Sequence, residues 1–288
     1  MHTEEVAWCV SNNLAFSIVN SGETVLAEGR VFDAHTQTGF VEKATLRNLV
    51  WDDLEESGTA RFPYPPHGRI PNFVGAKEAA EQLSRTHAWQ DASVIKVNPD
   101  APQLPVRRAA LRAGKTVYMA APRLRDAKPF LRLDPADVTD IQSATTVSGV
   151  SNHGVAVVPS AVPPIDLIVA GSVGVTRVGA RIGKGEGYSD LEWAVLCELG
   201  AVGGETTVAT TVHDRQLLDG SESPLAPDRS IPSPEAHDVP LDLIATPSAV
   251  QETSTPYTRP AGVDWSILTS ATIAEIPVLQ SRAPTESD

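Results

Sequence analysis

The sequence predicts an α/β fold in which a mostly parallel sheet is covered by helices on both faces. Short apolar segments of strand length alternate with helical patterns through most of the chain, as expected when parallel strands are joined by crossover helices. The chain has 288 residues, of which 41% are hydrophobic, enough for one large α/β domain or two small ones with a substantial core. No apolar run approaches the roughly 18 residues that would suggest a membrane span.

The first 40 residues are set apart from the rest of the chain. They contain the strand-like segments LAFSIV and TVLAEG. Val41 then opens an amphipathic helical pattern that ends at Ser57-Gly58. We predict that Val41 is the native start, because valine codons also serve as start codons, and that residues 1–40 are an upstream over-reading. The alternative is that they form a genuine two-stranded appendage.

The following elements come in a regular order. Four prolines make residues 62–73, FPYPPHGRIPNF, an extended loop. Helices are predicted at 75–89, 102–114 and 190–202, and strands at 92–97, 115–122, 153–159, 165–175, 206–214 and 241–247. Residues 219–238, rich in Ser, Pro and acids, are predicted to form a mobile insertion, and 281–288 a disordered tail. The main domain is therefore expected to span residues 41–280.

The charge balance argues against a protein that binds duplex nucleic acid. The chain carries 36 acidic residues against 23 Lys and Arg, a net charge of −13, whereas such proteins need a basic face. Only 6 of the 23 basic residues are lysines, and this pattern suggests the cytosol of a halophile. The acidic start MHTEEVAWCV lacks the features of a signal peptide, so we predict a cytoplasmic protein. Two cysteines, Cys9 and Cys197, do not suggest a disulfide framework.

The stretch RIGKGEGYSD, residues 181–190, carries the strongest functional signal. It follows a predicted strand, at the sheet edge where α/β proteins bind ligands. Glycine backbone in such a loop can form a nest for anions, and the helix that follows directs its positive end to the same place. Arg181 and Lys184 add positive charge, Asp190 could hold magnesium, and Tyr188 could donate a hydrogen bond or pack against a ring. The residues favour a polyphosphate site with a metal, and a plain tight loop is the alternative.

Taken whole, R-I-G-K-G-E-G-Y-S-D after a strand resembles the signature of the 5-formyltetrahydrofolate cyclo-ligase family. Lys43 and Arg47 have the i, i+4 spacing of a basic pair on that family's first helix, and Pro122-Arg123 is a weaker match. The likeness is greatest to the branch of methenyltetrahydrofolate synthetase domain-containing proteins. That likeness lies in HGRIPNF, IKVNPDAPQ, GSVGV, RIGKGEGYSDLEWA and TTVHD.

The resemblance implies a three-layer fold of the NagB/RpiA/CoA transferase-like type. It also implies ATP- and Mg²⁺-dependent closure of 5-formyltetrahydrofolate to 5,10-methenyltetrahydrofolate, in which ATP phosphorylates the formyl oxygen, N10 attacks, and phosphate leaves with ADP as the second product. By this resemblance Arg181 and Tyr188 are the catalytic candidates, and Asp190 is the metal ligand. The nucleotide-binding candidates are Lys43, Arg47, Arg181, Ile182, Gly183, Lys184, Gly185, Glu186, Gly187 and Tyr188.

Three departures from the family pattern affect the substrate half of the site. Ser189 replaces the second tyrosine of the motif, and Thr176 replaces an aspartate five residues before the motif arginine. The first core strand runs into VNPDAPQ instead of a folate-contacting glutamate, and Asp100 is the possible substitute. The expected partner is a folate-type small molecule, with no membrane or nucleic-acid partner, and the expected state is a monomer or weak dimer. The alternatives are an ATP-binding relative without folate activity and, as the animal members suggest, an RNA-associated protein.

Four other residues have both a functional and a structural interpretation. His213, with Asp214 beside it, could be a general base or could cap a strand. His67 and Arg69 could reach the substrate or could anchor the proline-rich loop. Lys96 could point into the cleft beside Asn98 or could face solvent.

Overall fold

The computed structural model describes residues 8–11, 14–17, 25–27, 30–32, 41–121, 124–225 and 231–284. The chain divides into two compact units, Met1–Gly39 and Phe40–Asp288. The first unit contains two antiparallel pairs, β1 with β2 and β3 with β4. These strands are Trp8–Ser11, Leu14–Ser17, Val25–Ala27 and Arg30–Phe32. The division lies next to Val41, and the native start at Val41 stays a prediction.

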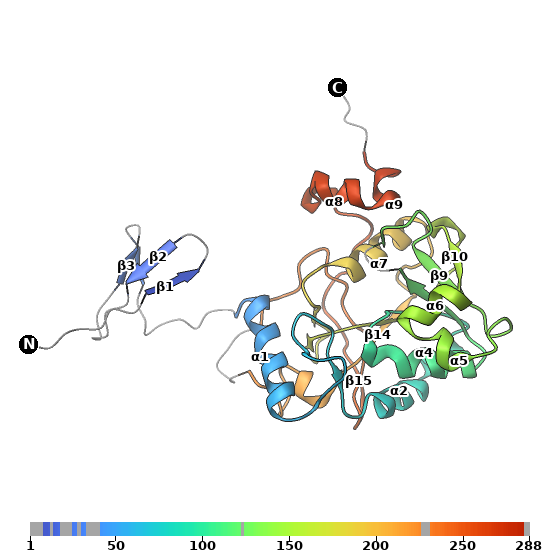
Figure 1. Ribbon diagram of the computed structural model, residues 1–288, viewed down its shortest axis with the longest axis horizontal. Helices are drawn as coiled ribbons and strands as arrows, with labels where there is room; N and C mark the ends of the chain where they lie inside the picture. The colour runs from blue at the N-terminus through green and yellow to red at the C-terminus, as the bar shows by residue number, and fades with distance from the viewer. Residues whose placement is uncertain are drawn as a thin grey trace, which may run out of the picture. The chain divides into compact units, whose positions relative to one another are not determined.

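An eight-stranded sheet in the order β10-β9-β8-β7-β11-β14-β15-β16 organises the second unit (Figure 1). Its central strands β8, β7, β11, β14 and β15 are mutually parallel, and the edge strands β9, β10 and β16 run antiparallel to their neighbours. The strands are β7 Val94–Val97, β8 Thr116–Ala120, β9 Phe130–Leu133, β10 Val155–Val157, β11 Leu167–Ala170, β14 Thr207–Thr211, β15 Leu243–Ala245 and β16 Val250–Glu252. The predicted α/β class with a mostly parallel sheet is therefore confirmed.

The two faces of the sheet carry separate apolar layers, because successive strand residues point to opposite sides. Val117 and Met119 of β8 pack with helices α2 to α6, whereas Tyr118 and Ala120 pack with α7 and the C-terminal helices. Figure 1 shows α2, α4 and α5 close together and α7 apart from them. Helices thus cover both faces, as predicted.

The helices and shorter elements have the following bounds. The helices are α1 Lys43–Glu56, α2 Ala76–Ser84, α3 His87–Asp91, α4 Leu104–Arg112, α5 Ile141–Ala144, α6 Val147–His153, α7 Tyr188–Glu198, α8 Ser270–Glu275 and α9 Pro277–Gln280. Single 3-10 turns are η1 Ala101–Gln103, η3 Pro159–Ala161, η4 Asp214–Gln216 and η5 Trp265–Ile267. Two small antiparallel pairs join β5 Ala60–Arg61 to β6 Asn72–Phe73 and β12 Gly174–Val175 to β13 Arg181–Ile182. Among the described residues, no helix is both long and apolar enough to cross a membrane.

The structure differs from the sequence prediction in the placement of some boundaries. The helix predicted at 75–89 is two helices, because the Thr86 hydroxyl accepts from the Trp89 N–H and starts α3 anew. The strand predicted at 165–175 stops at Ala170 and resumes as β12. The Pro122-Arg123 match and residues 226–230 and 285–288 lie outside the described residues, so the mobility predicted for 219–238 and the disorder predicted for 281–288 stay predictions.

Candidate active site

A cleft of about 530 Å³ opens where three neighbouring strands end. Residues at or just after the ends of β7, β8 and β11 line one side of the cleft, and the loop before α7 lines the opposite side. This is the edge of the sheet at which parallel α/β folds bind ligands. The lining includes Phe62, Pro63, Arg69, Asn98, Asp100, Arg107, Gly171, Arg181, Gly183, Lys184, Glu186, Gly187, Tyr188, Ser189, Asp190 and Glu192.

The loop that follows β7 is held in place by one buried arginine. The Arg107 guanidinium, 1% exposed, donates to the carbonyls of Asn98 at 2.6 Å, Asp100 at 3.0 Å and Thr145 at 2.8 Å. Burial lowers its pKa to about 10, and the charge of Asp100 acts in the opposite direction. Because α4 carries Arg107, this helix fixes where the segment VNPDAPQ enters the cleft.

The glycine loop before α7 adopts a conformation that only glycine tolerates well at two positions. Gly185 has φ of 105° and Gly187 has φ of 70°, both in the region that L side chains avoid. A Cβ on Gly185 would lie 3.3 Å from Cζ of Arg47, and the Arg47 Nε donates to the Gly183 carbonyl at 2.7 Å. Helix α1 therefore supports the loop through Arg47, which is not among the residues that line the cleft.

Arg181 and Asp190 form a buried ion pair at the base of this loop. Their side chains are 4% and 13% exposed, and Arg181 Nη1 also donates to the Gly171 carbonyl at 3.3 Å. Burial opposes the charge on Arg181, but the charge and hydrogen bond of Asp190 outweigh it and raise the pKa of Arg181. The Arg181 Nε has no hydrogen-bond partner among the described residues. This donor is buried, so Arg181 is held at the base of the loop mainly by Asp190 and the Gly171 carbonyl.

The predicted magnesium ligand, Asp190, already has two partners. Its Oδ1 accepts from Arg181 and, at 3.0 Å, from the backbone N–H of Val239. In the part of the chain that the structure describes, no group of three or more His, Cys, Asp or Glu side chains could hold a metal ion. These residues do not fit a preformed magnesium site, because Mg²⁺ demands a near-octahedral set of oxygen ligands. The assignment of magnesium to Asp190 stays a prediction.

Lys43, expected at the nucleotide phosphates, lies outside the cleft lining. Its ammonium group contacts Asp238 at 2.7 Å and Glu235 at 3.0 Å. Burial disfavours the charge on Lys43, yet the hydrogen bonds and charges of the two carboxylates prevail and raise the pKa of Lys43. Both partners lie in the segment predicted to be a mobile insertion.

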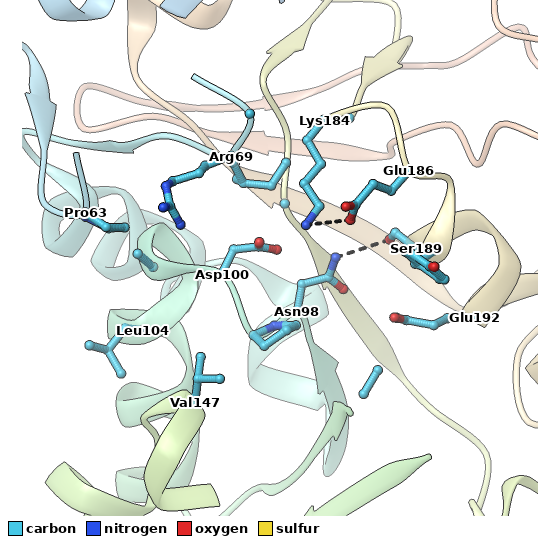
Figure 2. A pocket seen from close by; sticks show the side chains of 18 of the residues that line it. Pro63, Arg69, Asn98, Asp100, Leu104, Val147, Lys184, Glu186, Ser189 and Glu192 are labelled. Atoms are coloured by element: carbon cyan, nitrogen blue, oxygen red, sulfur yellow. Dashed lines mark hydrogen bonds and ion pairs between the residues drawn. The ribbon is translucent and has the colours of Figure 1, made fainter. Parts of the chain in front are cut away.

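Lys96 is buried in the centre of the sheet and does not face solvent. Its ammonium group pairs with Glu192 of α7 and donates to the Asn98 Oδ1 at 3.0 Å. The Asn98 amide in turn donates to the Ser189 hydroxyl at 3.2 Å (Figure 2). Ser189, which replaces the second tyrosine of the motif, is thus hydrogen-bonded to Asn98, the residue that follows β7.

Asp100 directs its carboxyl group into the cleft, toward the same space as Lys184 (Figure 2). One oxygen packs so close to Gly171 that a Cβ there would lie 2.8 Å from it. Among the described residues no side chain donates a hydrogen bond to this carboxyl group. Burial raises the pKa of Asp100, against the opposing charges of Lys184 and Arg107. A partly buried carboxyl group with these neighbours suits a ligand that brings its own donor.

The two histidines have structural partners. His213 Nδ1 accepts from the Arg215 N–H at 3.2 Å and caps η4, and burial lowers the pKa of His213. His67 contacts Asp52 at 2.8 Å and anchors the proline-rich loop to α1. Neither histidine lines the cleft, whereas Arg69 does.

The structure brings most of the predicted motif to one cleft. Arg181, Gly183, Lys184, Glu186, Gly187, Tyr188 and Asp190 all line it. Ile182 does not, because its side chain is buried in the core, and Gly185 faces Arg47 instead. Sequence reasoning missed Glu192 and Arg107, although a lysine in a buried strand signals a buried acidic partner.

Comparisons with known proteins agree with the motif. Residues 41–247 match the 5-formyltetrahydrofolate cyclo-ligase family. The chain is 41% identical over 244 residues to the methenyltetrahydrofolate synthase domain-containing protein of Bos taurus, and the match covers 84% of this chain and 62% of the bovine protein. Its identity to the Homo sapiens protein of the same name is 36% over 244 residues, or 84% of this chain and 61% of the human protein. The chain thus spans about three fifths of the length of these relatives.

One solved structure is also similar. It is the 5,10-methenyltetrahydrofolate synthetase of Aquifex aeolicus, with 14% sequence identity, a TM-score of 0.46, and coverage of 75% of this chain and 95% of that chain. At this level of similarity, the fold assignment rests on the strand order of the sheet itself.

Proposed function

Since the chain belongs to the 5-formyltetrahydrofolate cyclo-ligase family, we propose that it closes 5-formyltetrahydrofolate to 5,10-methenyltetrahydrofolate at the expense of ATP. The observation that carries this proposal is the cleft in which the RIGKGEGYSD loop faces the ends of β7, β8 and β11. One wall offers cationic groups and glycine backbone, and the other offers Asn98 and Asp100. Such a cleft suits a polyphosphate on one side and a polar heterocycle on the other.

The chemistry requires ATP because the formyl oxygen is a poor leaving group. Transfer of the γ-phosphoryl group to that oxygen makes the carbon electrophilic, N10 attacks it, and the C–O bond breaks with release of phosphate. N10 loses its proton in the process. The protein mainly has to position the groups and neutralise charge.

The nucleotide half of the cleft supports this role through its charges. Lys184, at 36% side-chain exposure, can exchange its contact with Glu186 for a phosphate oxygen. Arg181 adds its positive charge to the same wall, and the N-terminus of α7 favours an anion. Tyr188, at the start of α7, lines the same wall. Any magnesium would be held mainly by the phosphates, because the described residues offer no cluster of ligands for it.

The substrate half differs from the family pattern, and this difference favours a second candidate function. Ser189 stands where a tyrosine is expected, and it is joined to Asn98. An ATP-dependent enzyme that acts on another polar substrate would bind phosphate at the glycine loop. It would bind that substrate at the altered side of the cleft, where Ser189 meets Asn98. A cytoplasmic location, a monomer or weak dimer, and adaptation to high salt stay predictions.

The proposal is tested by mixing the full chain with 5-formyltetrahydrofolate, ATP and magnesium and following the ultraviolet absorbance of the methenyl product. We expect an ATP-dependent rise that Lys184→Met slows and that Lys77→Met leaves unchanged. Lys77 is an exposed lysine with a contact to Glu81 at 3.2 Å, so this control removes the same charge elsewhere. ATP binding without product would refute the folate reaction and favour the second candidate.

A further inference from the structure

The segment that precedes β15 reaches the predicted phosphate site at two points. Asp238 contacts Lys43 of α1 at 2.7 Å. The next residue, Val239, donates its backbone N–H to Asp190, the partner of Arg181. Two consecutive residues therefore hold a side chain of α1 and a side chain of α7. These contacts link Lys43 to the Arg181–Asp190 pair.

The two carboxylates that share Lys43 differ in how firmly they are held. The Asp238 side chain is 15% exposed, and its Oδ2 also accepts the backbone N–H of Glu235 at 2.8 Å. The Glu235 side chain is 62% exposed and contacts Lys43 at 3.0 Å. Ion pairs this exposed contribute only about 0.2–1 kcal/mol. Glu235 can therefore leave Lys43 at little cost, whereas Asp238 is fixed in place.

Lys43 lies one helical turn from Arg47, the α1 residue that contacts the glycine loop. Arg47, on the same face of α1, donates to the Gly183 carbonyl at 2.7 Å. An ammonium group has three donors and no acceptor. Lys43 can therefore keep its hydrogen bond to Asp238 while the N–H that now donates to Glu235 donates to another anion. A nucleotide phosphate at the glycine loop is such an anion, and it carries more charge than one carboxylate.

We propose that Glu235 competes with nucleotide phosphate for Lys43, and that Asp238 is the positioning residue that keeps Lys43 at the site. The proposal rests on the nucleotide-binding function proposed above. Glu235 then lowers the affinity for ATP, whereas Asp238 raises it. This assigns opposite effects to two acids of the same segment, which a general effect of negative charge could not produce.

The test measures the dissociation constant of ATP by titration calorimetry on the full chain, without the folate. We expect Glu235→Gln to tighten ATP binding about two- to fivefold, the range set by an exposed ion pair. Asp238→Asn should weaken ATP binding in the wild type but not in a Lys43→Met background, which a general loss of stability would not produce. In a Lys43→Met background, Glu235→Gln should have no effect. The matched control is Glu205→Gln, which removes an exposed charge just before β14, at the opposite edge of the sheet.

The outcomes separate this inference from the proposed function. If Glu235→Gln binds ATP as the Glu205→Gln control does, the competition is refuted, whatever the enzyme does with folate. If Lys43→Met leaves the ATP affinity unchanged, Lys43 has no phosphate role and the inference is overturned together with that assignment. If ATP binds and Glu235→Gln tightens it, but no methenyl product forms, the inference stands and the folate reaction fails.

Discussion

The buried pair of Lys96 and Glu192 joins the central strand β7 to helix α7, and removing one member should be costly. The two side chains are 1% and 7% exposed, so each charge has lost nearly all of its water. Lys96→Met keeps an unbranched side chain of similar length but leaves Glu192 without its cation. Removing one partner of a buried pair destabilises a protein by about 3–5 kcal/mol. The Asn98 amide oxygen would also lose a donor.

The effect is large enough to measure by scanning calorimetry. In a domain of this size each kcal/mol lowers Tm by about 2–4 °C, so a loss of ~4 kcal/mol predicts a decrease of about 8–16 °C. The double variant Lys96→Met/Glu192→Leu should recover most of this loss, because both charges leave the interior together. Lys77→Met, which breaks an exposed contact of 3.2 Å, should cost less than about 1 kcal/mol.

Two results would refute this reasoning. If Lys96→Met melted within the range of Lys77→Met, Glu192 would have to be solvated through the cleft that it lines, and the pair would not be desolvated as argued. If the double variant were no more stable than Lys96→Met, the cost would come from lost packing and not from the stranded carboxylate.

Three further predictions concern the cleft and its supports. Asp100→Asn should remove the penalty of ionising a partly buried carboxyl group whose pKa is raised above 3.8. The two proteins should have similar stability below that pH, and the variant should become more stable than the wild type as pH rises through the folded-state pKa of Asp100. Urea unfolding at a series of pH values checks this. His213→Asn should keep the η4 cap without its titration. Because burial lowers the pKa of His213 below 6.5, the wild type should lose stability relative to the variant as pH falls below 6.5, and equal pH profiles would contradict this. Gly185→Ala, at φ of 105° and 3.3 Å from Arg47, should weaken ATP binding severalfold, whereas Gly203→Ala, with nothing within 4 Å of its Cβ position, should not.

The order of the main elements could be predicted from the sequence, because strand and helix periodicity are local properties. The strands that end at Val97 and Ala120 carry buried apolar residues between turn signals, and these residues suffice to predict them. The edge strand β9 and the short helices α5 and α6 could not be predicted this way, since they are brief and their apolar residues follow no clear period.

The glycine loop could also be predicted, because its unusual backbone depends on glycine itself. RIGKGEGYSD after a strand was enough to place Lys184 and Tyr188 at the ligand edge of the sheet. The assignment of phosphate contacts to Lys43 could not be decided in the same way. Its partners Glu235 and Asp238 lie 192 and 195 residues away.

The sequence by itself determined the α/β class, the family and the position of the glycine loop at the carboxyl edge of the sheet. Only the tertiary structure decided how each charge is compensated: Lys96 by Glu192, Asp190 by Arg181, and Lys43 by an acidic segment from the far end of the chain. The physical reason is the range of the interactions. Backbone preferences act over a few residues, whereas the partner of a buried or half-buried charge is whichever residue the fold brings within about 4 Å.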